Sequence, residues 1–108
     1  MSQSYHILIF YVPEDHVETV KHAVFAAGGG RLGNYDSCCW QTSGTGQFRP
    51  LAGSSPYIGK HDELEKAREI RVEMICAESC LQDTLAALKE SHPYETPAFA
   101  HWPVQGME

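Results

Sequence analysis

Basic residues are scarce in this sequence. Lysine and arginine number 8 against 14 aspartates and glutamates, giving a formal net charge of -6 and a pI near 5.4. Proteins that bind the phosphate backbone of DNA or RNA present clustered Lys and Arg side chains, and this chain has no such surplus. We therefore expect no nucleic-acid partner.

Long apolar runs are also missing. The longest one, residues 7–12, is far shorter than the roughly 20 residues that a membrane-spanning helix needs. No Lys or Arg precedes it, so it makes a poor secretion signal. We expect a cytoplasmic protein with no membrane partner.

Several signature motifs are absent as well. The sequence has no Cys-x-x-Cys pair, no phosphate-binding GK[ST] loop, no dinucleotide-binding GxGxxG and no GxSxG nucleophile motif. We therefore predict no catalytic residue. The four cysteines, Cys38, Cys39, Cys76 and Cys80, are expected to be reduced thiols that mostly pack as small hydrophobic side chains.

What is present predicts one folded domain spanning residues 1–108. The composition is ordinary, with 43% hydrophobic and 20% charged residues, and a chain of 108 residues can bury one modest core. Residues 5–12 are β-branched and aromatic and stop at Pro13, which predicts a central strand. A helix should follow, with one apolar stripe, and glycines 28–30 should end it; the stripe is Val17, Val20 and Val24.

The middle of the chain is rich in glycine and proline. Residues 38–40 and 47–48 predict two short strands around a turn at residues 43–46, followed by an extended loop. Residues 60–68 are charged, which suits either a helical turn or an exposed hairpin arm.

The last third contains a strand, a helix and a strand. Residues 69–76 alternate, with Ile70, Val72, Met74 and Cys76 on one side and charged residues on the other. A helix over residues 79–91, with Ser79 as its N-cap, and a strand over residues 98–104 follow. The order β-α-β-β-α-β predicts an α+β, ferredoxin-like antiparallel sheet with two helices on one face and extra strand or loop material in the middle. The other face should be partly solvated or buried against another subunit.

Four segments carry a family resemblance. They are GGGRLGNYDSC at residues 28–38, GTGQFRP at 44–50, SPYIG at 55–59 and HPYE at 92–95. This series resembles the YqfO/Nif-three family, specifically the PII/CutA-like domain inserted in its long members, and the resemblance covers residues 5–102. It implies a PII/CutA-like fold and a homo-oligomer, a trimer by analogy.

The resemblance also bears on activity. Long family members carry a dinuclear metal centre supplied by two flanking lobes and are sometimes labelled GTP cyclohydrolases of a second type. The resemblance does not extend to those lobes, so we expect a small binding or regulatory module rather than an enzyme, with a metal ion or small anionic ligand at subunit boundaries. A protein–protein interaction domain is the alternative, and a metal-dependent hydrolase is the least favoured reading.

Two motifs supply candidate ligand-binding residues. Gly44, Gly46 and Phe48 lie where backbone N–H groups could cradle a small anion, although a tight hairpin that needs positive φ would use the same glycines. In the second motif, His92 and Glu95 could ligate a metal or exchange a proton. The alternative is a structural connector in which His92 caps the preceding helix, Pro93 stops it and Tyr94 packs. Tyr94 and Tyr35 complete the ligand-binding set.

A metal site is the last candidate. Cys38 and His92 are donors that suit a divalent metal or copper, and the CutA-type resemblance makes copper binding conceivable. Cys38 and Cys39 cannot easily bind one ion together, because neighbours on a strand point to opposite faces.

Overall fold

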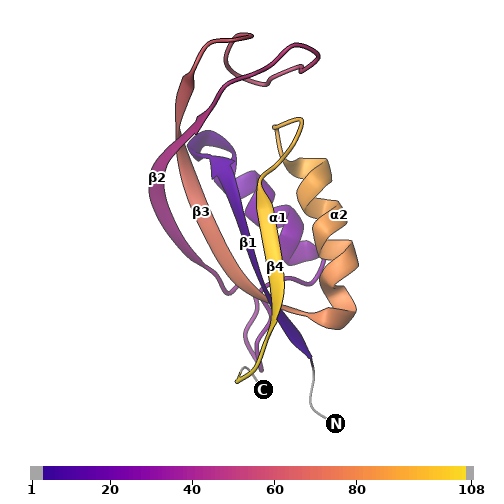
Figure 1. The fold of residues 1–108 in the computed structure, drawn as a ribbon. Helices are drawn as coiled ribbons and strands as arrows, with labels where there is room; N and C mark the ends of the chain where they lie inside the picture. Colours follow the sequence, from indigo (N-terminus) through magenta and orange to yellow (C-terminus); the bar gives the residue numbers. More distant parts are fainter. Residues whose placement is uncertain (1–3, 107–108) are drawn as a thin grey trace.

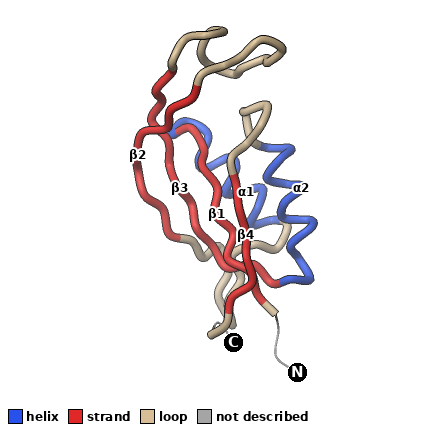
Figure 2. Tube along the Cα trace, viewed as in Figure 1, coloured by secondary structure: helices blue, strands red, loops and turns tan. Residues whose placement is uncertain are grey.

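The computed structural model of the chain describes residues 4–106. The elements are β1 (Tyr5–Pro13), α1 (Val17–Ala26), β2 (Trp40–Phe48), β3 (Glu65–Ala77), α2 (Leu81–Ser91) and β4 (Phe99–Val104), and a short 3-10 turn precedes each helix. The sheet has the order β2-β3-β1-β4, every pair is antiparallel, and both helices cover one face (Figures 1 and 2). The predicted ferredoxin-like βαββαβ fold is confirmed.

The hydrophobic core lies between the two helices and the central strands. Phe10 of β1 and Val72 of β3 face each other in the register, and both are fully buried. The predicted alternation of β3 is confirmed, since Ile70, Val72, Met74 and Cys76 all belong to the core. Both helices contribute an apolar stripe to the same core: the predicted Val17, Val20 and Val24 from α1, and Leu81, Leu85 and Leu88 from α2.

The end of α1 lies where the sequence predicts it, whereas the start of α2 does not. Gly28 and Gly30 follow α1 with φ of 115° and 77°, the left-handed region that glycine adopts cheaply, so the predicted stop is confirmed. The predicted start of α2 was wrong. The residues Glu78–Cys80 form a 3-10 turn, and the N-cap position of α2 falls on Cys80 instead of Ser79. Within residues 4–106 no helix combines the length and apolarity needed to cross a membrane.

The predicted turn at residues 43–46 was wrong. Trp40–Phe48 forms one continuous edge strand that pairs with β3, from Trp40 opposite Glu73 to Phe48 opposite Glu65. Neither Gly44 nor Gly46 has positive φ. Glycine and serine lowered the apparent strand propensity of this segment, but pairing with a long neighbouring strand overrode that preference.

The turn of this hairpin lies farther along the chain. β3 begins at Glu65, so residues 49–64 form an extended arm that projects beyond the sheet (Figure 1). Of the two structures expected for residues 60–68, the hairpin arm is the correct one. The polar start of β3 escaped prediction because it has no buried face to impose an apolar alternation.

The sheet face away from the helices is uncovered and carries large apolar side chains together with the charged residues of β3. Ile9 and Ile75 point to this face by alternation and are only 8% and 6% exposed. Trp40 and Trp102, also on this face by register, are 65% and 43% exposed. Large indole surfaces are therefore left exposed to solvent on this face.

Candidate functional site

The arm and the connection after α2 meet at one end of the sheet. We call residues 92–98 the HPYE loop, after its first four residues. The Ser55 backbone N–H donates to Oε2 of Glu95 across a distance of 3.0 Å, which ties the arm to this loop. Between them lies a pocket of about 270 Å³. Its lining residues are Gln47, Phe48, Pro50, Ser54, Pro56, Tyr57, Ile58, Glu69, Tyr94, Glu95, Thr96 and Ala98.

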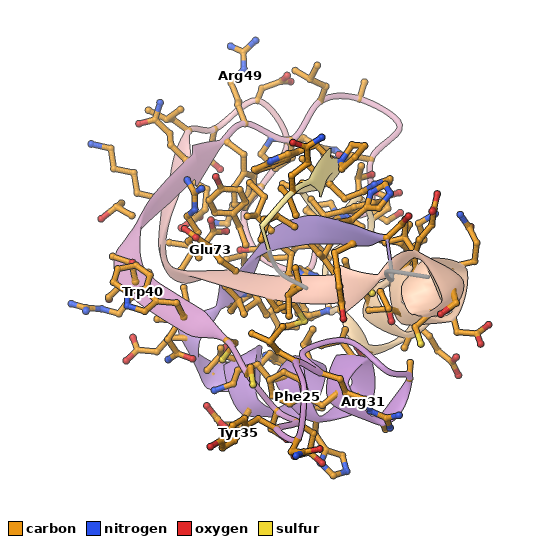
Figure 3. All side chains as sticks on the ribbon, turned by 90° about the horizontal axis from the view of Figure 1, so that it is seen from below. Phe25, Arg31, Tyr35, Trp40, Arg49 and Glu73 are labelled. Atoms are coloured by element: carbon orange, nitrogen blue, oxygen red, sulfur yellow. The ribbon has the colours of Figure 1, made fainter. Side chains whose placement is uncertain are left out.

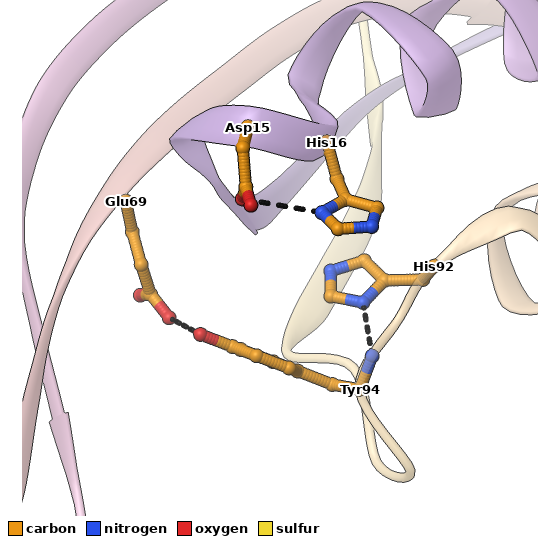
Figure 4. Close-up of polar contacts among 5 residues, drawn as sticks. All are labelled: Asp15, His16, Glu69, His92 and Tyr94. Atoms are coloured by element: carbon orange, nitrogen blue, oxygen red, sulfur yellow. Dashed lines mark hydrogen bonds and ion pairs between the residues drawn. The ribbon is translucent and has the colours of Figure 1, made fainter. Parts of the chain in front are cut away.

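Tyr94 lies at the centre of this site. Its hydroxyl donates to Oε2 of Glu69 on β3 at 2.7 Å (Figure 4). Its ring centroid lies 5.9 Å from that of Phe48 and 6.2 Å from that of Tyr57. The side chain therefore joins the end of β2, the arm and β3 in one wall of the pocket.

His92 supports Tyr94 from behind. The imidazole Nδ1 accepts the Tyr94 backbone N–H at 3.0 Å, and Nε2 lies 2.7 Å from the carbonyl oxygen of Tyr11 (Figure 4 shows the first contact). A carbonyl only accepts, so Nε2 carries the proton and the ring is neutral. Burial lowers the pKa of His92, with the hydrogen bond to Tyr11 and the nearby Glu69 charge opposing that shift.

This geometry decides between the two roles considered for His92. Both ring nitrogens are engaged, so neither is available to a metal ion or to a proton-transfer partner in this arrangement. The connector role fits, with one difference: the ring bonds the Tyr11 carbonyl of β1 rather than the carbonyls at the end of α2. His92 therefore fixes the HPYE loop to the sheet.

Gly46 provides space for Glu69. A Cβ atom on Gly46 would overlap the Glu69 carboxylate, the same group that accepts the Tyr94 hydroxyl. Glycine is needed here for close approach and not for its backbone freedom, since its φ is not positive. Gly44 has open space in place of a side chain and lines a shallow hollow on the uncovered sheet face beside Tyr11 and Arg71.

We expect Tyr94→Phe to lower the free energy of unfolding by about 1–2 kcal/mol at pH 7, because Glu69 loses a charge-assisted hydrogen bond in a half-buried site. Burial is the largest cause of a raised pKa for Tyr94, and the hydrogen bond and charge of Glu69 add to it. The unfolded chain ionises this group first, so its contribution to stability is present below pH 10 and is lost as the pH rises above that value.

Urea unfolding at pH 7 and between pH 9.5 and 11 measures both effects. The wild type should lose more stability than Tyr94→Phe over the alkaline range. Tyr35→Phe is the matched control, because Tyr35 is 75% exposed and lies away from the pocket. Equal alkaline losses in Tyr94→Phe and the wild type would contradict the assignment.

The structure brings some predicted site residues together and separates others. Phe48, Tyr94 and Glu95 line the pocket, while Gly46 and His92 support its walls. Tyr35 and Cys38 belong to the loop between α1 and β2, at the opposite end of the sheet. The Gly30 N–H bonds the carbonyl of Ile75 there, and the Cys38 N–H bonds the carbonyl of Gly30.

The structure does not bring Cys38 and His92 together. Cys38 is hydrogen-bonded to Gly30, which in turn bonds Ile75 of β3. His92 bonds Tyr11 of β1, and Tyr11 pairs with Arg71, at a different position along β3. Across residues 4–106 no group of three or more His, Cys, Asp or Glu side chains is arranged to hold a metal ion. A metal site built from Cys38 and His92 within one copy of the chain is thus not supported.

Two important residues escaped the sequence analysis. Glu69 was assigned to the polar side of a strand, and nothing in its neighbours indicated that Gly46 and Tyr94 converge on it. Tyr57 lies in the SPYIG motif, and its ring stands edge-on to His16 with centroids 5.3 Å apart. An aromatic residue in a loop rich in glycine and proline was the available signal.

Comparison with known proteins shows which family has this architecture. A family profile described as CutA1 divalent ion tolerance protein matches residues 52–108, more than half of the chain. The chain belongs to the CutA1 family. The crystal structure of CutA1 from Ehrlichia chaffeensis matches all of this CutA1-family chain and 88% of its own, with a TM-score of 0.66 at 14% identity, which shows the shared fold.

Longer proteins contain a similar segment. A protein of Halalkalibacterium halodurans named GTP cyclohydrolase 1 type 2 homolog is 39% identical over 103 residues, covering 95% of this CutA1-family chain and 28% of its own length. A Bacillus cereus protein related to NIF3 gives a TM-score of 0.83 at 31% identity, covering 98% of this chain and 27% of that one. The resemblance to the YqfO/Nif-three family is confirmed. The chain spans about a quarter of these relatives, and the cyclohydrolase name is theirs.

Proposed function

We propose that this chain is a binding module for a small molecule and that the pocket between the arm and the HPYE loop is its site. One observation supports this most strongly. Three segments far apart in the sequence converge on the pocket, and hydrogen bonds interlock them through Glu69, Tyr94 and Glu95. A lining of aromatic residues with a few placed polar groups is typical of small-molecule sites.

We also propose that the module is a cytoplasmic homo-oligomer, a trimer by analogy. The uncovered sheet face with Trp40 and Trp102 supports association, and four unpaired cysteines fit a reducing compartment. Native mass spectrometry of the untagged protein, isolated without chelators, reports subunit number and bound mass together. A monomer would count against self-association and favour docking of a different protein on this face.

A divalent ion is a second candidate ligand, because the family description names divalent ions. Within residues 4–106 no single copy arranges three donors around one point. A metal site would therefore combine donors from more than one copy. Bound metal in the native mass spectrum of an oligomer would support that arrangement.

The pocket itself is tested with a neutral probe. Benzyl alcohol at millimolar concentration should shift backbone amide resonances of residues 47–58 and 94–98 in a ¹H–¹⁵N spectrum. Tyr57→Ala should weaken these shifts severalfold, because it removes one aromatic wall. Tyr35→Ala, the matched change at an exposed distant tyrosine, should leave them unchanged.

Shifts confined to other parts of the chain would place the site elsewhere. Shifts at the pocket that Tyr57→Ala leaves unaltered would also contradict the proposal.

A further inference from the structure

The charged residues that line the pocket are all acidic. Its lining contains two carboxylates, Glu69 and Glu95, and no Lys, Arg or His. Arg49 follows Phe48 in the chain, but its side chain points outward at the periphery of the molecule (Figure 3). Arg68, next to Glu69, forms an ion pair with Glu14 at 3.2 Å. An anionic ligand would meet repulsion from both carboxylates, and the lining residues include no cation to offset it.

Each carboxylate retains capacity to accept further hydrogen bonds. Oε2 of Glu69 receives the Tyr94 hydroxyl, and Oε2 of Glu95 receives the Ser55 N–H. An ionised carboxylate has about four lone-pair sites, so one protein donor leaves room for a ligand donor on each. Both groups are held in place by the contact they already make.

The remaining walls are aromatic and apolar. The Tyr94 ring lies between the other two, with its centroid 5.9 Å from that of Phe48 and 6.2 Å from that of Tyr57. Aromatic faces attract cations, and the attraction grows when solvent is displaced. A volume of about 270 Å³ accommodates a small organic molecule.

We propose that the pocket selects a small organic cation, an ammonium or guanidinium group carried on an apolar or aromatic body. The cationic head contacts Glu69 or Glu95, and the body lies against the rings of Phe48, Tyr57 and Tyr94. This inference rests on the proposed binding function and specifies the charge of its ligand. The expected ligand charge is therefore opposite to the small anion predicted from the glycine motif. The residues of that motif form an extended strand and not a cradle of N–H groups.

The test compares three probes that share one ring and differ in head charge: benzylammonium, benzyl alcohol and benzoate. Titrations at pH 7 follow the amide resonances of residues 47–58 and 94–98. We expect benzylammonium to bind about tenfold more tightly than benzyl alcohol, since it adds a charge-assisted hydrogen bond and a cation–aromatic contact. Benzoate should bind more weakly than benzyl alcohol.

Charge-removing variants locate the effect. Glu69→Gln and Glu95→Gln should each weaken benzylammonium severalfold and leave benzyl alcohol within twofold. Glutamine keeps an acceptor oxygen for Tyr94 or Ser55, so the pocket walls are retained. Glu90→Gln, at an exposed position on α2 outside the pocket lining, removes the same charge and should change nothing.

The outcomes separate this inference from the proposed function. Benzoate binding as tightly as benzylammonium at the pocket amides would overturn the inference and leave the binding site standing. An equal loss of both probes in the glutamine variants would show that the carboxylates act only structurally, which also overturns it. Zinc chloride shifting the same amides at lower concentration than benzylammonium would replace the organic cation with an inorganic one. Absence of any pocket shift with all probes would remove the proposed function itself.

Discussion

His92→Ala is expected to lower the free energy of unfolding by about 2–4 kcal/mol. The imidazole is 6% exposed and makes two hydrogen bonds, to the Tyr11 carbonyl and from the Tyr94 N–H. Alanine leaves both backbone groups without their partner and opens a void behind Tyr94. Urea unfolding at a fixed protein concentration measures the loss, because any oligomer makes stability concentration-dependent.

The stability contributed by His92 should also depend on pH. Its pKa is lowered in the folded state, chiefly by burial, so the unfolded chain takes up the proton first as the pH falls below 6.5. Stability is therefore complete above about pH 7 and declines on acidification until the pH reaches the folded-state pKa. His92→Gln, which cannot titrate, should lack this part of the acid loss.

His22→Gln is the matched control for both experiments, because His22 is exposed on α1. It should keep the stability of the wild type and its acid loss. An acid profile of His92→Gln that superimposes on the wild-type profile would mean that His92 is not the responsible group. A loss below 1 kcal/mol in His92→Ala would mean that the HPYE loop holds its place without it.

Phe10→Ala is expected to cost more, about 3–5 kcal/mol. Phe10 is 0% exposed, and its side chain belongs to the core between the sheet and the helices. Removing the ring leaves a cavity that packed neighbours cannot fill without moving. Against a typical stability of about 5–15 kcal/mol, this loss brings the chain close to unfolding at 37 °C.

Phe48→Ala makes the same chemical change in the pocket, and the comparison separates packing from binding. Phe48 is half-buried at the end of β2, so we expect a loss of about 1 kcal/mol or less. Benzyl alcohol binding should fall severalfold. Thermal and urea unfolding with amide titration measure both quantities. A Phe48→Ala variant as unstable as Phe10→Ala would show that the pocket wall is part of the core.

Local patterns in the sequence were sufficient for the core of the fold. The alternation in residues 69–76 and the stripes of valine and leucine in the helices each mark one buried face, and burial of such faces dominates folding. The order of elements then leaves few topologies for an antiparallel sheet with two helices. These features depend on residues within one or two turns of each other.

Tertiary structure decided β2 and the site. Residues 43–46 read as a turn between two short strands, because their glycines favour turns in isolation. Only the long partner strand β3 holds them extended. Contact between Gly46, Glu69 and Tyr94 joins positions widely separated in the chain. No local period encodes such a contact, so the sign of charge in the pocket could not be predicted from the glycine motif.

By itself the sequence determined the βαββαβ order, the buried faces and the family resemblance, because each depends on short-range periodicity or on motifs that can be compared directly. The tertiary structure alone decided which residues of those motifs meet. It brought Phe48, Tyr94 and Glu95 to one pocket and left Tyr35 and Cys38 at the other end of the sheet. The physical reason is register: the antiparallel pairing of β1, β2 and β3 sets which distant side chains become neighbours.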